Sequence, residues 1–186
     1  RRPARTRLGR GRCLRTAPGV SLPGLDFFCT TIESPDGDVE LLLLAMTAMN
    51  APADPDNAEE RKGCSGHVGK MIFSAGVDQL AMVAYVPEAK ADKVDINVWG
   101  KHVCDTVGGK ILGEAKKADS PDGGLVLEMS VAADTDAGKF PLKDKDAAMA
   151  AAFAYLREKG AFPEGNSDSD DDPVYGDDAF DDIENL

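Results

Sequence analysis

Residues 71–110 read MIFSAGVDQLAMVAYVPEAKADKVDINVWGKHVCDTVGGK, and this stretch decides the fold. Its first half holds two short apolar runs, 71–75 and 79–87, on either side of a Gly/Asp break, a pattern that predicts a β-hairpin. Its second half predicts a helix that Asp95 caps and Gly108-Gly109 ends. Residues at helical spacing predict one face of that helix: Val98, Trp99, His102, Val103, Thr106 and Val107. The centre of the chain is therefore strand, strand, helix.

The segments on either side of this centre extend the pattern. Aromatic and β-branched residues in 25–33 predict a strand, and 125–131 alternates as a further strand should. Helices are expected over 39–49 and over about 144–159. The expected buried stripe of the first of these helices is Leu41, Leu42, Ala45, Met46 and Met49. The order β-α-β-β-α-β-α predicts a single small α+β sandwich with helices packed on a mixed sheet.

Charge divides the chain into three parts. The whole chain carries −12, but the first 24 residues hold seven Arg and no acid, while residues 164–186 hold ten acids and no base. This leaves −9 for the expected folded domain, residues 25–163. We expect 1–24 to be an unstructured basic arm or the remnant of a targeting peptide. An acidic domain disfavours tight non-specific binding to nucleic acid or to an anionic membrane.

The cysteines do not predict a disulfide framework or a redox site. Cys13, Cys29, Cys64 and Cys104 are widely and irregularly spaced, so neither a disulfide framework nor a C-x-x-C motif is present. A reducing compartment is expected: the cytosol, or an organelle stroma or matrix if the Arg-rich start is a targeting remnant. Apolar runs are too short for membrane insertion. Cys64 and His67 are weak candidates for metal ligands, and a metal site is not expected.

The acidic C-terminal segment contains apolar residues at intervals. Tyr175, Phe180, Ile183 and Leu186 recur among its Asp and Glu residues. A purely solubilising segment needs no apolar side chains. An acidic peptide that becomes ordered in a basic, apolar groove of a partner does need them. The pattern predicts partner docking, with an inert solvated segment as the alternative.

Residues 25–160 resemble the C-terminal (C-Ala, DHHA1-related) domain of alanyl-tRNA synthetase. The likeness rests on the opening strand and helix, the hairpin ending in Tyr85-Val86-Pro87, the helix with Trp99, and the run Val107-Gly108-Gly109-Lys110. A small-residue strand near Ser130 and an Ala-rich final helix also match. The resemblance implies a non-catalytic module that handles tRNA and can self-associate.

Two functions follow as expectations. The first is an interaction or assembly module that docks on a larger protein or ribonucleoprotein complex, partly through the acidic segment. The alternative is a tRNA- or RNA-binding appendage whose implied contact residues are Lys101, Gly108, Gly109, Lys110, Lys116 and Lys117. That alternative requires the lysines to converge, because phosphate contacts need a local excess of base. No cofactor is expected, and without a nucleophile beside a base no catalysis is expected either.

Overall fold

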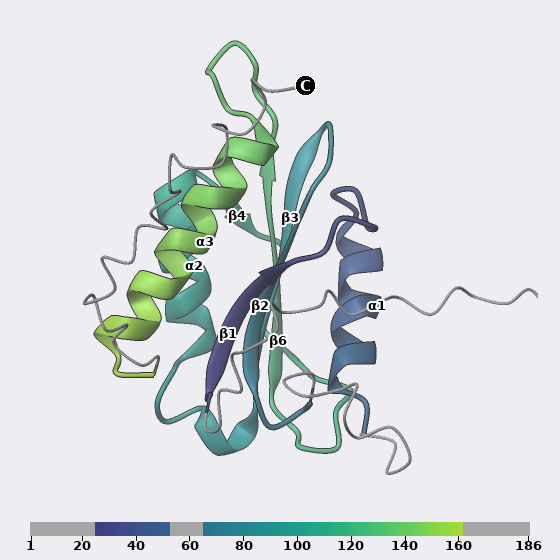
Figure 1. The fold of residues 1–186 in the computed structure, drawn as a ribbon, viewed down its shortest axis with the longest axis vertical. Helices are drawn as coiled ribbons and strands as arrows, with labels where there is room; N and C mark the ends of the chain where they lie inside the picture. Colours follow the sequence, from purple (N-terminus) through teal and green to yellow (C-terminus); the bar gives the residue numbers. More distant parts are fainter. Residues whose placement is uncertain (1–24, 53–64, 162–186) are drawn as a thin grey trace, which may run out of the picture.

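The computed structural model describes residues 25–52 and 65–161. These residues build a mixed sheet with α-helices on both faces (Figure 1). The strands are β1 (Phe27–Thr31), β2 (Gly69–Ala75), β3 (Gln79–Val86), β4 (Lys110–Ile111), β5 (Lys116–Lys117) and β6 (Leu125–Ala132). The helices are α1 (Val39–Asn50), the short 3₁₀ helix η2 (Glu88–Lys90), α2 (Ile96–Val107) and α3 (Pro141–Glu158). This confirms the predicted α+β class.

The sheet has the order β1-β2-β3-β6-β4, and β5 also pairs with β6. β2 and β3 form the predicted hairpin, and β6 continues it on the other side of β3, all antiparallel. β1 is the exception, because it runs parallel to β2 at the edge of the sheet. A parallel neighbour needs a crossover connection, and α1 lies in that connection. β4 and β5 are two-residue strands that the sequence pattern does not reveal.

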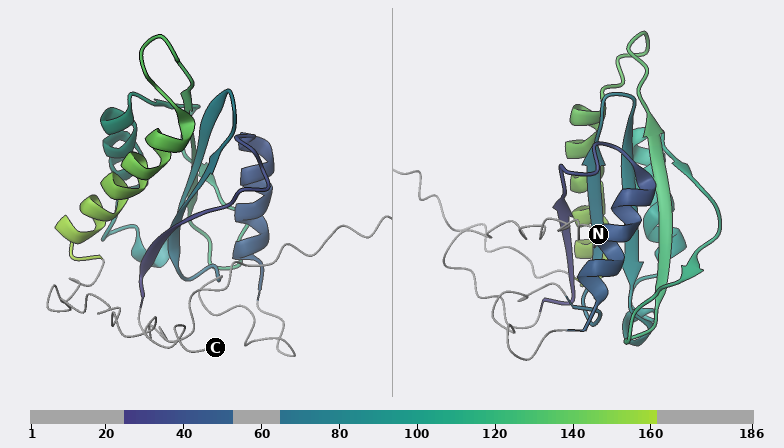
Figure 2. Two further views of the ribbon diagram at one scale, coloured as in Figure 1. Left: turned by 45° about the horizontal axis from the view of Figure 1, so that its top comes forward. Right: turned by 90° about the vertical axis from the view of Figure 1, so that its right-hand side faces the viewer.

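The helices cover the sheet unequally. α2 and α3 pack against one face, whereas α1 lies alone on the other (Figures 1 and 2). The larger core lies under α2 and α3 and is centred on Trp99, which is fully buried. Its indole N–H donates to the Ala152 carbonyl at 3.3 Å, and the ring meets Phe27 edge-on. The only Trp in the sequence therefore joins β1, α2 and α3.

The predicted face of α2 is partly wrong. Trp99, Val103 and Val107 are buried as expected, but Val98 is half exposed, and His102 and Thr106 are exposed. The buried stripe is instead completed by Ile96, Gly100 and Cys104. Gly100 is required there, because a Cβ would lie 2.4 Å from the Leu127 side chain. The sheet approaches the helix over a residue that apolar periodicity does not identify as core.

Leu41 was expected in the core and is not. The buried residues of α1 are Leu42, Met46 and Asn50, whereas Leu41 is 51% exposed. Asp38 caps the helix, accepting from the amides of Glu40 and Leu41. Since almost every residue of this helix is apolar, its sequence does not show which side meets the sheet.

Candidate functional site

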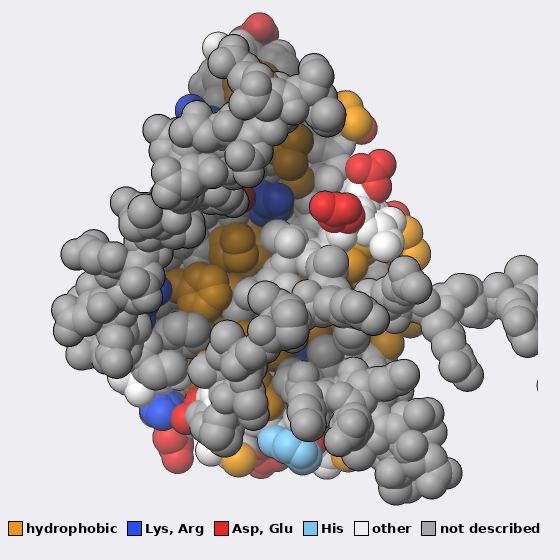
Figure 3. Space-filling model, in the orientation of Figure 1, with side chains coloured by type: hydrophobic (Ala, Val, Ile, Leu, Met, Phe, Trp, Pro, Cys, Tyr) orange, Lys and Arg blue, Asp and Glu red, His pale blue; other side chains and the backbone are white. Residues whose placement is uncertain are grey.

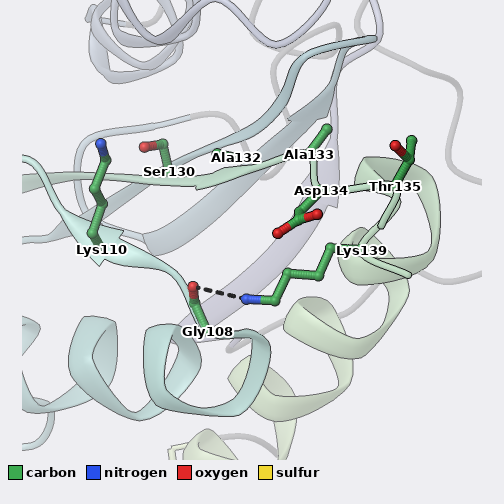
Figure 4. A pocket seen from close by; sticks show the side chains of 8 residues that line it. All are labelled: Gly108, Lys110, Ser130, Ala132, Ala133, Asp134, Thr135 and Lys139. Atoms are coloured by element: carbon green, nitrogen blue, oxygen red, sulfur yellow. Dashed lines mark hydrogen bonds between the residues drawn. The ribbon is translucent and has the colours of Figure 1, made fainter. Parts of the chain in front are cut away.

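A cavity of about 450 Å³ lies where α2 ends and β4 begins (Figure 4). Its lining is Gly108, Lys110, Ser130, Ala132, Ala133, Asp134, Thr135 and Lys139. The structure thus places two of the residues implied for nucleic-acid binding, Gly108 and Lys110, beside Ser130, Thr135 and Lys139. Sequence reasoning missed these last three as site residues. Lys139 is 31 positions from Gly108, whose carbonyl it approaches at 3.5 Å, and no local motif connects the two.

Gly108 of this cavity and its neighbour Gly109 serve to end a helix. Gly108 has φ of 67°, the left-handed conformation in which glycine has no steric penalty, and its amide donates to the Cys104 carbonyl. The Gly109 amide donates to the same carbonyl at 2.8 Å. Both N–H groups are therefore used within the fold and are not free to bind a phosphate.

The lysines implied for nucleic-acid binding do not share one face. Lys110 and Lys116 stand opposite Ser130 and Val126 in the ladder, which puts them on the α1 side of the sheet. Lys117 stands opposite Leu125, which packs toward the α2 and α3 side. The Lys116 ammonium is also 2.7 Å from the Glu128 carboxylate, and this ion pair offsets much of its positive charge.

The remaining lysines are also spread out. Lys101 is exposed on α2 and lines no part of the cavity. Within the cavity, Lys139 extends toward the Gly108 carbonyl and Lys110 extends in a different direction, and Asp134 lies beside Lys139 (Figure 4). The local excess of base that the nucleic-acid alternative requires is therefore small.

His67 is held by a carboxylate. Its Nδ1 lies 2.9 Å from Asp122 Oδ1, and both side chains are accessible to solvent. Among residues 25–52 and 65–161, no group of three or more His, Cys, Asp or Glu residues is placed to bind a metal ion. Cys64, the other weak candidate, lies outside the described residues.

Beside His67, a buried polar network closes one end of the sheet. The Tyr85 hydroxyl lies 2.7 Å from the Gly66 carbonyl, 2.8 Å from the Gly123 carbonyl and 3.2 Å from Ser120 Oγ. Burial raises the pKa of this phenol, so the hydroxyl keeps its proton and can donate. The network ties the segment before β2 to the segment before β6.

Lys70 of β2 continues this network and is fully buried. Its ammonium donates to Asn50 Oδ1 at 2.7 Å and to the Ser65 carbonyl at 2.8 Å. It also lies 5.3 Å from the centre of the Tyr85 ring. A buried ammonium needs such partners, and here they join the end of α1 to the start of β2. Because Lys70 is enclosed, we assign it a structural role.

The outer side of α1 presents exposed apolar side chains. Leu41 and Leu44 are 51% and 64% exposed, and Ala48 is exposed one turn further on. These residues are spaced i, i+3, i+7 and so form one stripe along the helix, which we call the α1 outer face. The residues predicted to dock a partner, Tyr175, Phe180, Ile183 and Leu186, all lie outside the described residues. The sequence pattern did not indicate the α1 outer face.

The described part of the chain has no helix with both the length and the apolar character needed to cross a membrane. Neither a scan against protein-family models nor a search of curated proteins finds a match to this sequence.

Proposed function

We propose that this protein is a non-catalytic interaction module that docks on a larger protein partner, and that the α1 outer face is a contact surface. The observation that carries the proposal is the exposure of Leu41 and Leu44 on a helix that is apolar on all sides. A helix of that kind is normally buried all round. Exposed apolar stripes rimmed by polar residues are typical of protein contact sites.

The direct test is Leu44→Glu in the full chain, with Leu142→Glu as the matched control. Leu142 is 69% exposed, but it belongs to α3 on the opposite side of the sheet. Complexes would be crosslinked in native extract and separated by size. We expect wild type and Leu142→Glu to enter the same complex and Leu44→Glu to remain free. If all three variants enter that complex equally, the α1 outer face is not the contact surface.

The resemblance to the C-Ala domain supports a second candidate, an RNA-binding appendage. The observation in its favour is the cavity lined by Lys110, Lys139, Ser130 and Thr135, because ammonium and hydroxyl groups are the side-chain donors that phosphate requires. Against it stand the scattered lysines and the net charge of the domain.

A tRNA titration over a salt series tests this second candidate, with Lys110→Glu as the site variant and Lys143→Glu as the control. Lys143 is exposed and lines no part of the cavity. Binding that weakens with salt and is lost only in Lys110→Glu would establish the RNA function. Absence of binding at low salt would remove it.

A further inference from the structure

A second cavity of about 540 Å³ lies at the N-terminal end of α1, between the start of this helix and the turn of the β2–β3 hairpin. Its lining is Asp36, Gly37, Asp38, Val39, Glu40, Val77, Asp78 and Gln79. Four of these residues carry carboxylates and none carries a basic group. Val77 is 83% exposed, so the rim also presents an apolar side chain. Acidic and hydrophobic side chains stand beside each other over these elements (Figure 3).

The carboxylates of this cavity lack basic partners. Asp36, Asp38, Glu40 and Asp78 are exposed, and none of them forms an ion pair with another residue in the described ranges. Asp38 uses one oxygen to cap α1. Elsewhere acidic side chains do find lysines, as Asp26 does with Lys90 at 2.9 Å. The negative charge at this rim is therefore available to a ligand from outside the domain.

The rim is held rigidly. The Gln79 side-chain amide donates to the Gly37 carbonyl at 2.8 Å, and the Gly37 amide donates to the Ser74 hydroxyl at 3.2 Å. A Cβ on Gly76 would lie 2.1 Å from the Asp36 carbonyl oxygen, so the two backbones touch at this point. The turn residues of both segments are thus locked together before any partner binds, which lowers the entropic cost of binding.

The acidic rim and the apolar stripe lie on one continuous surface. Glu40 and Leu44 are four residues apart on α1 and are therefore neighbours on its surface. Leu41 follows Glu40 directly. A partner segment that lies along α1 would contact Leu41, Leu44 and Ala48, and it would reach the carboxylates at the N-terminal end of α1.

We propose that this surface binds a basic amphipathic helix of a partner protein, with apolar side chains on Leu41 and Leu44 and Lys or Arg side chains at Glu40, Asp36 and Asp78. A helix suits the surface because it satisfies its own backbone groups, whereas an extended segment would leave unpaired N–H and C=O groups against leucines. This inference rests on the proposed docking function and adds the chemistry of the partner.

A second copy of the chain fits the surface less well. Two copies would bring eight carboxylates to one interface, since each contributes the four that line the cavity and no base. Each whole chain also carries −12. Complementary charge speeds association and fixes orientation, whereas like charges oppose both.

The test uses a fluorescent helical peptide of Leu and Lys on opposite faces, titrated into the full-length protein and followed by anisotropy. A peptide with the same pattern but with Glu in place of Lys is the control for non-specific hydrophobic binding. We expect only the basic peptide to bind, and to bind more weakly as salt rises. Leu44→Glu should abolish binding, while Leu142→Glu should leave it unchanged.

The charge term is tested separately with two double variants that each remove two negative charges. Glu40→Gln with Asp78→Asn should weaken binding about tenfold. Glu114→Gln with Asp136→Asn, at exposed positions outside the cavity, should change binding less than twofold. Equal weakening by both pairs would show that only net charge matters and would overturn the proposal.

Other results identify other occupants. A dimer in sedimentation that Leu44→Glu abolishes, without peptide binding, would assign the surface to a second copy. Displacement of the basic peptide by a synthetic peptide of residues 1–24 would assign it to the chain's own Arg-rich segment. If the Leu44→Glu variant fails to enter the native complex but the basic peptide does not bind the wild-type protein, the docking function stands and this inference fails.

Discussion

At the scale of single residues, the hydroxyl of Tyr85 holds two loops in place. It lies within hydrogen-bonding distance of two carbonyls and the Ser120 hydroxyl, at one end of the sheet. Gly66, which supplies one of the carbonyls, lies close to this network, since a Cβ there would lie 2.3 Å from the Asp122 carboxylate and would displace that side chain. Closure of this end depends on one side chain that reaches both segments.

We predict that Tyr85→Phe lowers the free energy of unfolding by about 1–3 kcal/mol, because it leaves a buried carbonyl without its donor. Urea denaturation measures the change. Tyr155→Phe is the control, since the Tyr155 hydroxyl makes no hydrogen bond with the described residues, and its loss should cost under about 0.5 kcal/mol. Equal effects of the two substitutions would contradict the assigned role.

Asp26 makes the stability of the fold depend on pH in the acidic range. Hydrogen bonds from Lys93, which has the larger effect, and from Lys90 lower the pKa of this carboxyl from its usual value of 3.8. A carboxyl whose pKa is lower in the folded state stabilises the fold above its unfolded pKa, and this stabilisation is lost as pH falls through the folded value.

We predict that Asp26→Asn makes the melting temperature less sensitive to pH below about pH 4, where the wild-type carboxyl takes up its proton. Melting curves at a series of acidic pH values measure this. Asp92→Asn, a substitution in the same surface region at a residue with no ion pair in the described part of the chain, is the control. Parallel pH profiles for wild type and Asp26→Asn would contradict the prediction.

At the scale of elements, α1 has two apolar sides with different roles. Leu42 is fully buried against the sheet, and Leu44, two positions on, is 64% exposed. One side holds the helix on the fold, and the other is the surface that we propose as a contact site.

We predict that Leu42→Ala costs about 2–5 kcal/mol of stability, whereas Leu44→Ala costs under about 0.5 kcal/mol in the isolated protein. Denaturant titration of both variants gives the comparison. A large loss for Leu44→Ala would mean that this side chain is covered in solution by the protein itself.

The elements with strong local signals were predictable. The hairpin followed from two apolar runs around a Gly/Asp break, and the α2 cap followed from Asp95. Leu41 was misplaced because an all-apolar helix has no distinct apolar side. β4 and β5 were missed because two-residue strands exist only through their pairing with β6. Lys139 was missed as a lining residue because only tertiary structure brings it to Gly108.

At the scale of the whole molecule, the sheet is strongest in its middle. β3 has neighbours on both sides, β2 and β6, and is buried along nearly its whole length. β1 pairs only with β2 and forms an edge. Local opening of such a structure begins where few hydrogen bonds and few buried contacts hold an element.

We predict that amide hydrogen exchange is slowest in β3 and considerably faster in β1. The measurement is hydrogen–deuterium exchange on the full-length protein, compared peptide by peptide. Protection of β1 equal to that of β3 would indicate that another chain or segment covers the β1 edge.

The position of Trp99 gives the molecule an internal optical probe. Its indole is shielded from solvent and contacts Phe27, while its N–H is bonded to Ala152. As the only Trp in the sequence, it contributes the whole of the indole emission. A red shift of that emission would therefore report the separation of β1, α2 and α3, and would stay silent when a partner occupies the far face, where α1 lies.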